Sequence, residues 1–407
     1  MRGVGRPTAR TTTRRTCTAD RAAAVVTRAP PVADSEGTLT SGGPAAVVRM
    51  PRVAAVNPLG RRKETGMTTL ADIRATAREI LADSKGILAA DESTGTITKR
   101  LEAVGVASTE ENRRRFRDLL FTTKDVEQHL GGVILYDETV RQTALDGTGM
   151  VETLRRRGIV PGIKVDAGAK DLAGFPGEKV TEGLDGLRER FAEYRELGLR
   201  FAKWRTVTSV SATLPTATAV ELNAHVQARY AALAQEAGLL PIVEPESIMD
   251  GDHGIDRSAE VTEQVLAATV EQLRRQRVAL EGVLVKTNMV VSGYAGPDQA
   301  GPDEVADRTL AVLHRTVPAA VPGVVFLSGG QADAQANANL DAIARRGPQP
   351  WTVSFSYARA LQGRPMATWA GAEENVAAAQ DAFALRLQLT GAATRGDWSS
   401  DAERAAS

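Results

Sequence analysis

The 407-residue sequence contains a single cysteine, Cys17, so no internal disulfide bond is possible and a reducing compartment, the cytoplasm, is expected. No apolar run is long enough to cross a bilayer, so no membrane association is expected. Only four histidines are present, and no two of them stand at the spacing of metal ligands. We therefore expect no metal site.

The formal net charge is zero, but the charge is unevenly distributed along the chain. Residues 1–66 carry twelve basic and four acidic residues, a net charge of +8, which leaves −8 for residues 67–407. An acidic main part argues against nucleic acid as a partner. Residues 1–66 are rich in Arg, Thr, Ala and Pro and lack periodicity, so we predict a disordered basic extension.

Three explanations fit this extension, of which a basic nucleic-acid-binding arm is less favoured than a transit peptide. The extension loosely resembles an organellar transit peptide, which would direct import into an organelle. Alternatively the start is over-extended, because Met67 opens a segment that leads directly into a predicted helix with Thr69 near its cap. We favour the over-extended start.

From Met67 onward, short apolar runs alternate with charged, amphipathic stretches, the pattern of βα units with a parallel sheet. The predicted helices include 184–197, 217–236, 261–278 and 304–315. Eight apolar runs predict a (β/α)8 TIM barrel in one domain, residues 67–390, followed by a flexible C-terminal tail, 391–407. A doubly wound sheet is the alternative, but residues 91–95 do not form its Gly-rich loop. The eight runs are 86–90, 132–136, 162–166, 201–205, 241–244, 282–288, 323–327 and 351–355.

Almost every predicted strand ends in polar or charged side chains. In barrels of this kind the active site lies at the carboxyl ends of the strands. Unpaired buried charges are costly, so we expect these groups to surround one cavity where they compensate one another. A purely structural ion-pair network is the alternative interpretation.

Lys286 is the most informative of these residues, because it ends an apolar, β-branched run. Desolvation there favours the neutral amine, which is the nucleophile that forms a Schiff base with a carbonyl. Lys203 is the expected cationic neighbour that makes protonation of Lys286 more costly. A strand-end lysine that extends to water is the alternative.

Residues two apart on a strand point to the same side, so three pairs should each share a face: Lys164 with Asp166, Lys203 with Arg205, and Glu244 with Glu246. Lysines and carboxylates in one cavity can transfer protons around a covalent amine adduct. Two anion sites are predicted beside the amine. One comprises Ser328, Gly329, Gly330 and Arg359, and the other Ser93, Thr96, Lys164 and Arg205. This arrangement predicts a substrate with a phosphate at each end.

The chain resembles the class I fructose-bisphosphate aldolases from about residue 80 to 389. The resemblance rests on eight motifs that occur in family order: 86–95, 131–138, 162–166, 201–205, 241–246, 284–289, 326–331 and 355–362. It implies reversible cleavage of fructose 1,6-bisphosphate to glycerone phosphate and glyceraldehyde 3-phosphate, in glycolysis and gluconeogenesis. It also implies a homotetramer that needs no metal and no organic cofactor. Ala358 departs from the glycine usual in the family, and no tyrosine follows Tyr357.

The resemblance also implies the role of each site residue. Lys286 forms the imine, and Glu244 shuttles protons with Glu246 beside it. Asp91 handles the proton of the hydroxyl whose loss cleaves the carbon–carbon bond, and Lys203 supports the charges near the imine. One phosphate is held by Ser328, Gly329 and Arg359, with Arg100 nearby; the other is held by Ser93, Thr96 and Lys164, with Arg205 lining the cavity.

Two other functions compete with this one. The first is a Schiff-base aldolase that acts on a singly phosphorylated sugar. The second is a non-catalytic barrel that binds anions or acts as a scaffold. The second is disfavoured because Lys286, Glu244 and Asp91 are all present.

Overall fold

A computed structural model describes residues 69–405 of the chain. The chain divides into two units, Met1–Arg62 and Lys63–Ser407, and every helix and strand below belongs to the second. The predicted disordered extension, residues 1–66, and the proposed start at Met67 lie outside the described residues.

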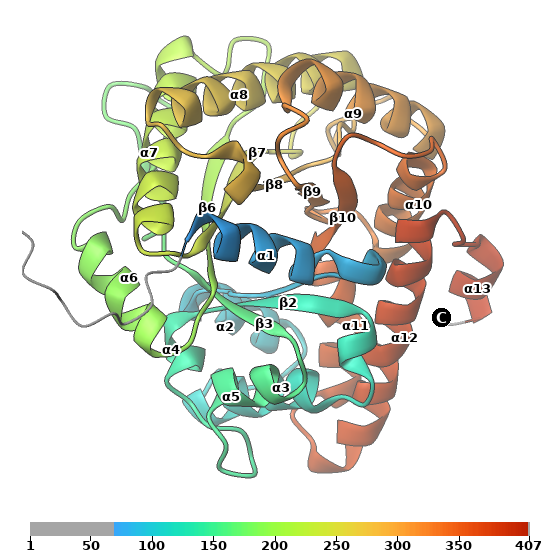
Figure 1. Ribbon diagram of the computed structural model, residues 1–407. Helices are drawn as coiled ribbons and strands as arrows, with labels where there is room; N and C mark the ends of the chain where they lie inside the picture. The colour runs from blue at the N-terminus through green and yellow to red at the C-terminus, as the bar shows by residue number, and fades with distance from the viewer. Residues whose placement is uncertain (1–68, 406–407) are drawn as a thin grey trace, which may run out of the picture. The chain divides into compact units, whose positions relative to one another are not determined.

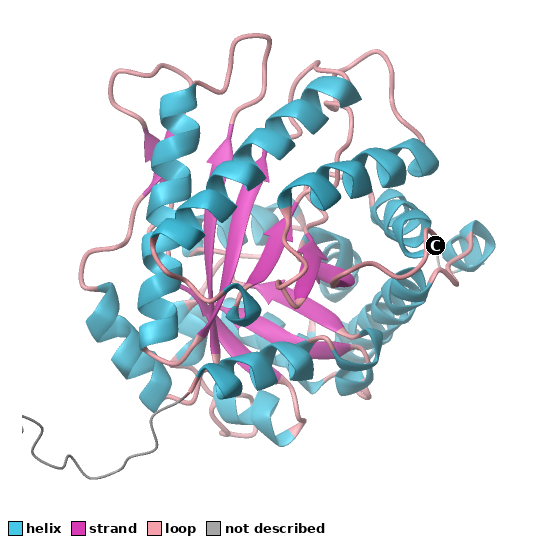
Figure 2. Cartoon of the chain, turned by 45° about the horizontal axis from the view of Figure 1, so that its top comes forward, coloured by secondary structure: helices cyan, strands magenta, loops and turns pink. Residues whose placement is uncertain are grey.

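Eight parallel strands close into a barrel in the order β1-β10-β9-β8-β7-β6-β3-β2 (Figure 2). Each of the eight predicted runs overlaps one of these strands, so the prediction of a (β/α)8 barrel is confirmed. Apolar, β-branched strands flanked by amphipathic helices are buried on both faces, as a parallel sheet requires. The strands are β1 (Gly86–Ala90), β2 (Leu130–Leu135), β3 (Val160–Lys164), β6 (Phe201–Thr208), β7 (Leu240–Ser247), β8 (Leu284–Thr287), β9 (Gly323–Phe326) and β10 (Thr352–Tyr357).

Helices surround the barrel in the described part of the chain (Figure 1). The predicted helix 217–236 coincides with α7, whereas α8 begins six residues before its predicted start, directly after the N-cap Gly254. None of the described helices is long and apolar enough to cross a membrane. The helices are α1 (Leu70–Ile80), α2 (Thr94–Ala103), α3 (Glu110–Thr122), α4 (Asp137–Val140), α5 (Met150–Arg156), α6 (Leu187–Glu196), α7 (Ala217–Glu236), α8 (Ile255–Arg275), α9 (Pro302–Thr316), α10 (Asp333–Ala344), α11 (Arg359–Trp369), α12 (Val376–Arg395) and α13 (Ser400–Ala405), with 3₁₀ turns at Ala82–Ser84, Val126–Gln128, Leu280–Gly282 and Glu373–Asn375.

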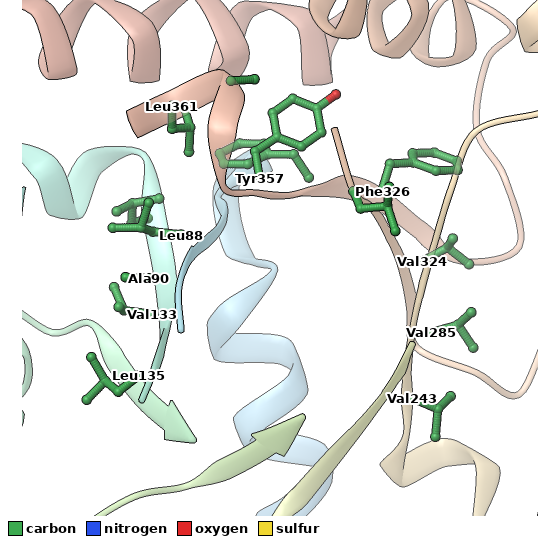
Figure 3. Close-up of a cluster of buried hydrophobic side chains, with 14 of the residues drawn as sticks. Leu88, Ala90, Val133, Leu135, Val243, Val285, Val324, Phe326, Tyr357 and Leu361 are labelled. Atoms are coloured by element: carbon green, nitrogen blue, oxygen red, sulfur yellow. The ribbon is translucent and has the colours of Figure 1, made fainter. Parts of the chain in front are cut away.

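Alternate residues of the barrel strands enter two separate cores, because successive side chains of a strand point to opposite faces. One set faces outward and packs against the helices, as Val243, Val285 and Val324 do in Figure 3. The other set, which includes Phe201, points inward and forms a smaller apolar cluster. Two cores drawn from the same strands fix the register of every strand, since a one-residue slip would exchange them.

Helix α1 closes the amino-terminal end of the barrel, which we call the floor. Its buried residues Ile73, Ala77 and Ile80 belong to the inner apolar cluster. The helix begins with a capping box in which the Thr69 side chain accepts from the Asp72 N–H and Asp72 accepts from the Thr69 N–H. The floor is therefore sealed by apolar packing, and solvent reaches the barrel interior from the opposite end.

Two short antiparallel strands follow β3 and were absent from the sequence prediction. They are β4 (Ala169–Asp171) and β5 (Lys179–Thr181). Strand β4 is exposed along its length, so its sequence shows neither an apolar run nor an alternating pattern. Asn223 of α7 anchors β5 by accepting from the Thr181 N–H and donating to the Lys179 carbonyl.

The predicted tail boundary at residue 391 falls inside α12, which continues to Arg395. Beyond it, α13 carries Glu403, a buried carboxylate that is paired with Arg386 of α12. Trp398 donates its backbone N–H to Asp341 and its indole N–H to Glu403. The barrel domain is therefore longer than predicted at this end. The boundary was missed because the residues that make these contacts are polar or isolated in sequence.

Candidate active site

A cavity of about 670 Å³ lies at the carboxyl ends of the barrel strands. All the predicted site residues except Gly330 line it: Asp91, Ser93, Thr96, Arg100, Lys164, Lys203, Arg205, Glu244, Glu246, Lys286, Ser328, Gly329 and Arg359. The charged strand ends therefore surround one cavity, as expected.

Strand alternation explains why these side chains converge. On β6, Phe201 belongs to the inner apolar cluster and Lys203, two residues on, lines the cavity. On β7, Ile242 belongs to the same apolar cluster, and Glu244 and Glu246 line the cavity. On both strands the inward-facing side chains are apolar near the floor and charged two residues further toward the carboxyl end.

The centre of the cavity holds a buried chain of alternating charges, which we call the charge network. Lys203 Nζ lies 2.6 Å from Asp91 Oδ2 and 3.0 Å from Glu244 Oε2. Lys286 Nζ lies 3.0 Å from the other oxygen of Glu244. None of the four side chains is more than 9% exposed. Two cations and two anions in contact compensate one another, which is the condition for burying them at all.

The charge network shifts the protonation equilibria of its carboxylates. Burial opposes the ionisation of Asp91, but the ammonium groups of Lys203 and Lys286 outweigh it and bring its pKa down to about 2. Burial likewise opposes ionisation of Glu244, yet Lys203, Lys286 and Arg205 lower its pKa below the ordinary value. For Lys203, burial is outweighed by Asp91 and Glu244, so its pKa is raised. Lys203 is therefore a fixed cation between two carboxylates.

One rim of the cavity is formed by β3, β6 and the start of α2. Lys164 Nζ lies 2.8 Å from Asp166 Oδ1, which confirms that these two side chains share a face. Arg205 Nε lies 2.5 Å from Glu246 Oε2. The hydroxyls of Ser93 and Thr96 are 3.2 Å apart at the entrance to α2. The rim therefore offers cations and hydroxyls to an anion.

The opposite rim is formed by the ends of β9 and β10. Ser328 and Gly329 follow β9, and Arg359 is the first residue of α11 after β10. Arg100 reaches this region from α2 and is paired with the buried carboxylate of Glu92. The other Glu92 oxygen lies 2.5 Å from Arg117, which is buried behind it. Glu92 therefore holds Arg100 in place, a role that the sequence did not indicate.

Gly330 is the predicted site residue that does not line the cavity. Its N–H donates to the hydroxyl of Tyr294, at 3.0 Å, so it is engaged on the side of the loop away from the cavity. The predicted contact of Gly330 with a phosphate therefore stays a prediction that this geometry does not support. A glycine pair after a strand indicates close approach but does not tell which backbone N–H faces the ligand.

Ten further residues line the cavity without having been predicted as site residues, among them Glu92, Lys99 and Ser356. The buried hydroxyl of Ser356 has no hydrogen-bond partner among the described residues, so it is free to bind a ligand. Lys99 stands three residues after Thr96 on α2, a spacing that places both on one helix face and could have identified it. Within residues 69–405, no group of three or more His, Cys, Asp or Glu is arranged to hold a metal ion.

A closed parallel barrel with two buried lysines in a carboxylate network, between two cation-bearing rims, has the arrangement of a (β/α)8 enzyme with an amine nucleophile and an anionic substrate. The model of the class I fructose-bisphosphate aldolases matches residues 72–407. The chain belongs to the class I fructose-bisphosphate aldolase family.

Relatives from bacteria, plants and animals agree with this assignment. A probable class 1 fructose-bisphosphate aldolase of Xanthomonas campestris is 50% identical over 79% of this chain and 97% of its own. Cytosolic fructose-bisphosphate aldolase 6 of Arabidopsis thaliana is 49% identical over 82% of this chain and 93% of its own. The solved structure of fructose-bisphosphate aldolase from Plasmodium falciparum, in complex with TRAP and a small-molecule inhibitor, has a TM-score of 0.80 at 44% identity. That comparison covers 81% of this chain and 96% of the other.

Proposed function

We propose that this protein cleaves fructose 1,6-bisphosphate reversibly into glycerone phosphate and glyceraldehyde 3-phosphate, through an imine on Lys286. The observation that carries the proposal is the position of the Lys286 amine. It is buried, lies 3.0 Å from Glu244, and sits in one cavity between two rims that carry cationic and hydroxyl side chains. A ketose with a phosphate at each end matches this order of groups.

The order of the strands indicates which end of the substrate lies at each rim. Strand β8, which carries Lys286, pairs with β9, whose loop carries Ser328 and Gly329. The carbonyl carbon C2 and the phosphate on C1 are adjacent in the substrate, so they occupy these neighbouring strands. The 6-phosphate lies four carbons beyond C2 and reaches the rim that carries Lys164, Ser93 and Thr96.

Imine formation requires one proton acceptor, and Glu244 is placed for it. Lys286 gives a proton to Glu244, and its neutral amine then forms a bond to C2. After proton transfer within the adduct, Glu244 returns the proton to the C2 hydroxyl, which leaves as water. The product is a protonated imine on Lys286. Lys203 lies 3.0 Å from Glu244 and lowers its pKa, which favours return of the proton to the C2 hydroxyl.

Cleavage of the C3–C4 bond then requires a base for the C4 hydroxyl. Asp91 is ionised at neutral pH and accepts that proton while the electron pair of the bond moves to the imine nitrogen. Glyceraldehyde 3-phosphate leaves, and an enamine remains on Lys286. Protonation at C3 and hydrolysis of the imine release glycerone phosphate. The protonated imine stabilises the developing carbanion, which is where the transition state needs stabilisation.

We also propose a cytoplasmic location and a homo-oligomer, with the tetramer of the family as the specific expectation. The cytosolic name of the Arabidopsis relative supports the first. The resemblance to the family supports the second. Light scattering on the purified protein distinguishes a tetramer from smaller species. Cell fractionation separates a cytoplasmic protein from one imported through residues 1–66.

The function is tested by measuring cleavage of fructose 1,6-bisphosphate with and without EDTA. We expect turnover that EDTA leaves unchanged, and a kcat/KM for fructose 1-phosphate at least tenfold lower because one rim is left empty. Equal kcat/KM for the two sugars would instead support an aldolase of singly phosphorylated sugars. Absence of turnover with either sugar would contradict the proposed function.

A further inference from the structure

Tyr294 lies behind the loop that follows β9, on the side away from the cavity. Its hydroxyl accepts from the Gly330 N–H at 3.0 Å and donates to the sulfur of Met249 at 3.4 Å. Ser328 and Gly329, the preceding residues of the same loop, line the cavity. The loop is therefore contacted by Tyr294 from behind while its front is open to a ligand.

The two glycines of this loop lie directly against Met249 and Tyr294. A Cβ atom on Gly329 would lie 1.9 Å from the Met249 methyl carbon, and Gly329 has a φ of +53°, which disfavours other residues. A Cβ atom on Gly330 would lie 2.6 Å from a ring carbon of Tyr294. Both side chains thus press directly on the loop backbone, which leaves the loop little freedom on this side.

Tyr294 itself is fixed by hydrogen bonds between the loops that follow β7 and β8. Its N–H donates to the Met249 carbonyl at 3.0 Å. The neighbouring N–H groups of Gly293 and Ala295 donate to His253 and Gly251, each at 2.8 Å. These bonds connect the strands that carry Glu244 and Lys286 to the residue that contacts the β9 loop. Burial raises the pKa of Tyr294, so the hydroxyl keeps the proton that it donates to Met249.

We propose that Tyr294 is a positioning residue for the 1-phosphate: it holds the Ser328–Gly330 loop in the binding conformation before the substrate arrives. The inference rests on the proposed function, because it assigns the phosphate beside Lys286 to this loop. A loop that is already ordered binds its ligand without a further entropic cost, so loss of the hydroxyl weakens binding at this rim alone.

The test is the Tyr294→Phe protein, which keeps the ring and removes the hydroxyl. We expect the KM for fructose 1,6-bisphosphate and the inhibition constant of glycerone phosphate to rise about fivefold to tenfold, the range of one lost hydrogen bond. The kcat should stay within about twofold, because the charge network is untouched. The inhibition constant of glyceraldehyde 3-phosphate, which binds the other rim, should not change.

Two further variants keep the test specific. Tyr194→Phe is the matched control, since the Tyr194 hydroxyl contacts Asp137, outside the cavity lining. All its constants should equal those of the wild type. In Gly330→Ala the new methyl displaces the Tyr294 ring, so Tyr294→Phe should add little on top of it.

Unchanged constants in Tyr294→Phe would overturn the inference, as would equal effects on both products. A lower KM would also overturn it, because the hydroxyl would then compete with phosphate for the Gly330 N–H. These outcomes are separable from failure of the proposed function, since they require a wild-type protein that cleaves the sugar. A wild-type protein without turnover would remove the function and the inference together.

Discussion

The two ends of the barrel bury opposite kinds of side chains on the same strands. At the floor, Phe201, Leu240 and Leu284 form an apolar layer under α1. At the mouth, inward-facing positions on the same three strands carry Lys203, Glu244 and Lys286. Burial of apolar side chains stabilises the floor. Burial of charged side chains at the mouth is unfavourable unless opposite charges compensate one another. The apolar layer and the charged residues are thus only two to four residues apart along each strand.

The largest effect is expected from a substitution at the mouth of the barrel. Lys203→Met leaves Asp91 and Glu244 without their shared cation and raises the pKa of both carboxylates. We expect kcat to fall about 10³-fold or more, because both proton transfers and the charges near the imine depend on this residue. Steady-state kinetics measures this fall in kcat. Lys85→Met, a lysine at the floor end of β1, is the control and should keep its kcat.

The next largest effect is expected from a substitution at the floor. Phe201 is fully buried, and a Cβ atom on Gly162 would lie 2.3 Å from its ring, so the layer is tightly packed. Phe201→Ala should lower the free energy of unfolding by about 3–5 kcal/mol. Urea unfolding measures the change, and kcat per folded molecule should stay within about twofold. A large loss of kcat in the folded protein would show that the two ends are not separable.

The pH dependence of stability should distinguish the two ends. Asp91 has a pKa of about 2 in the folded protein against an ordinary 3.8, so folding favours its charged form. The resulting stabilisation, on the order of 2 kcal/mol, is complete above about pH 5 and is lost as the pH falls toward 2.

Urea unfolding of the wild type and of Asp91→Asn between pH 7 and pH 3 tests this directly. The difference between the two proteins should shrink as the pH falls. The difference between the wild type and Phe201→Ala should stay constant, because no titrating group is involved. A pH-independent difference for Asp91→Asn would contradict the assignment of the low pKa.

The smallest effect is expected at the exposed edge of the mouth. Lys99 lines the cavity but is exposed, so its attraction for a phosphate is screened by water. Lys99→Ala should raise the KM for fructose 1,6-bisphosphate about threefold without changing kcat or the unfolding free energy. A change in kcat of tenfold or more would place Lys99 in the chemical step instead.

The features that the sequence predicted are those with a strong local pattern. Buried strands of a parallel barrel are continuous apolar runs, so all eight were found, and alternation predicted that Lys203 shares a face with Arg205 and Glu244 with Glu246. The β4–β5 hairpin was missed because β4 is exposed and short. Segment α13 was missed because its contacts, such as Arg386 with Glu403, join polar residues.

Site residues, too, were predicted only where the local sequence carries a pattern. Strand-end residues were predicted because a strand pattern points to them. Glu92 and Tyr294 make contacts between elements that are distant in sequence, and no periodicity indicates such contacts. Gly330 was assigned to the ligand because a glycine pair does not reveal which side of the loop is crowded. The structure shows that Tyr294 occupies that side.

The most direct measurement is reduction with borohydride in the presence of fructose 1,6-bisphosphate, followed by peptide mapping. If a buried amine at the barrel mouth forms the imine, one triose phosphate or hexose bisphosphate adduct per chain will be found on Lys286, and Lys286→Ala will show neither adduct nor turnover. Labelling of Lys203 in its place, or full turnover by Lys286→Ala, would contradict the account.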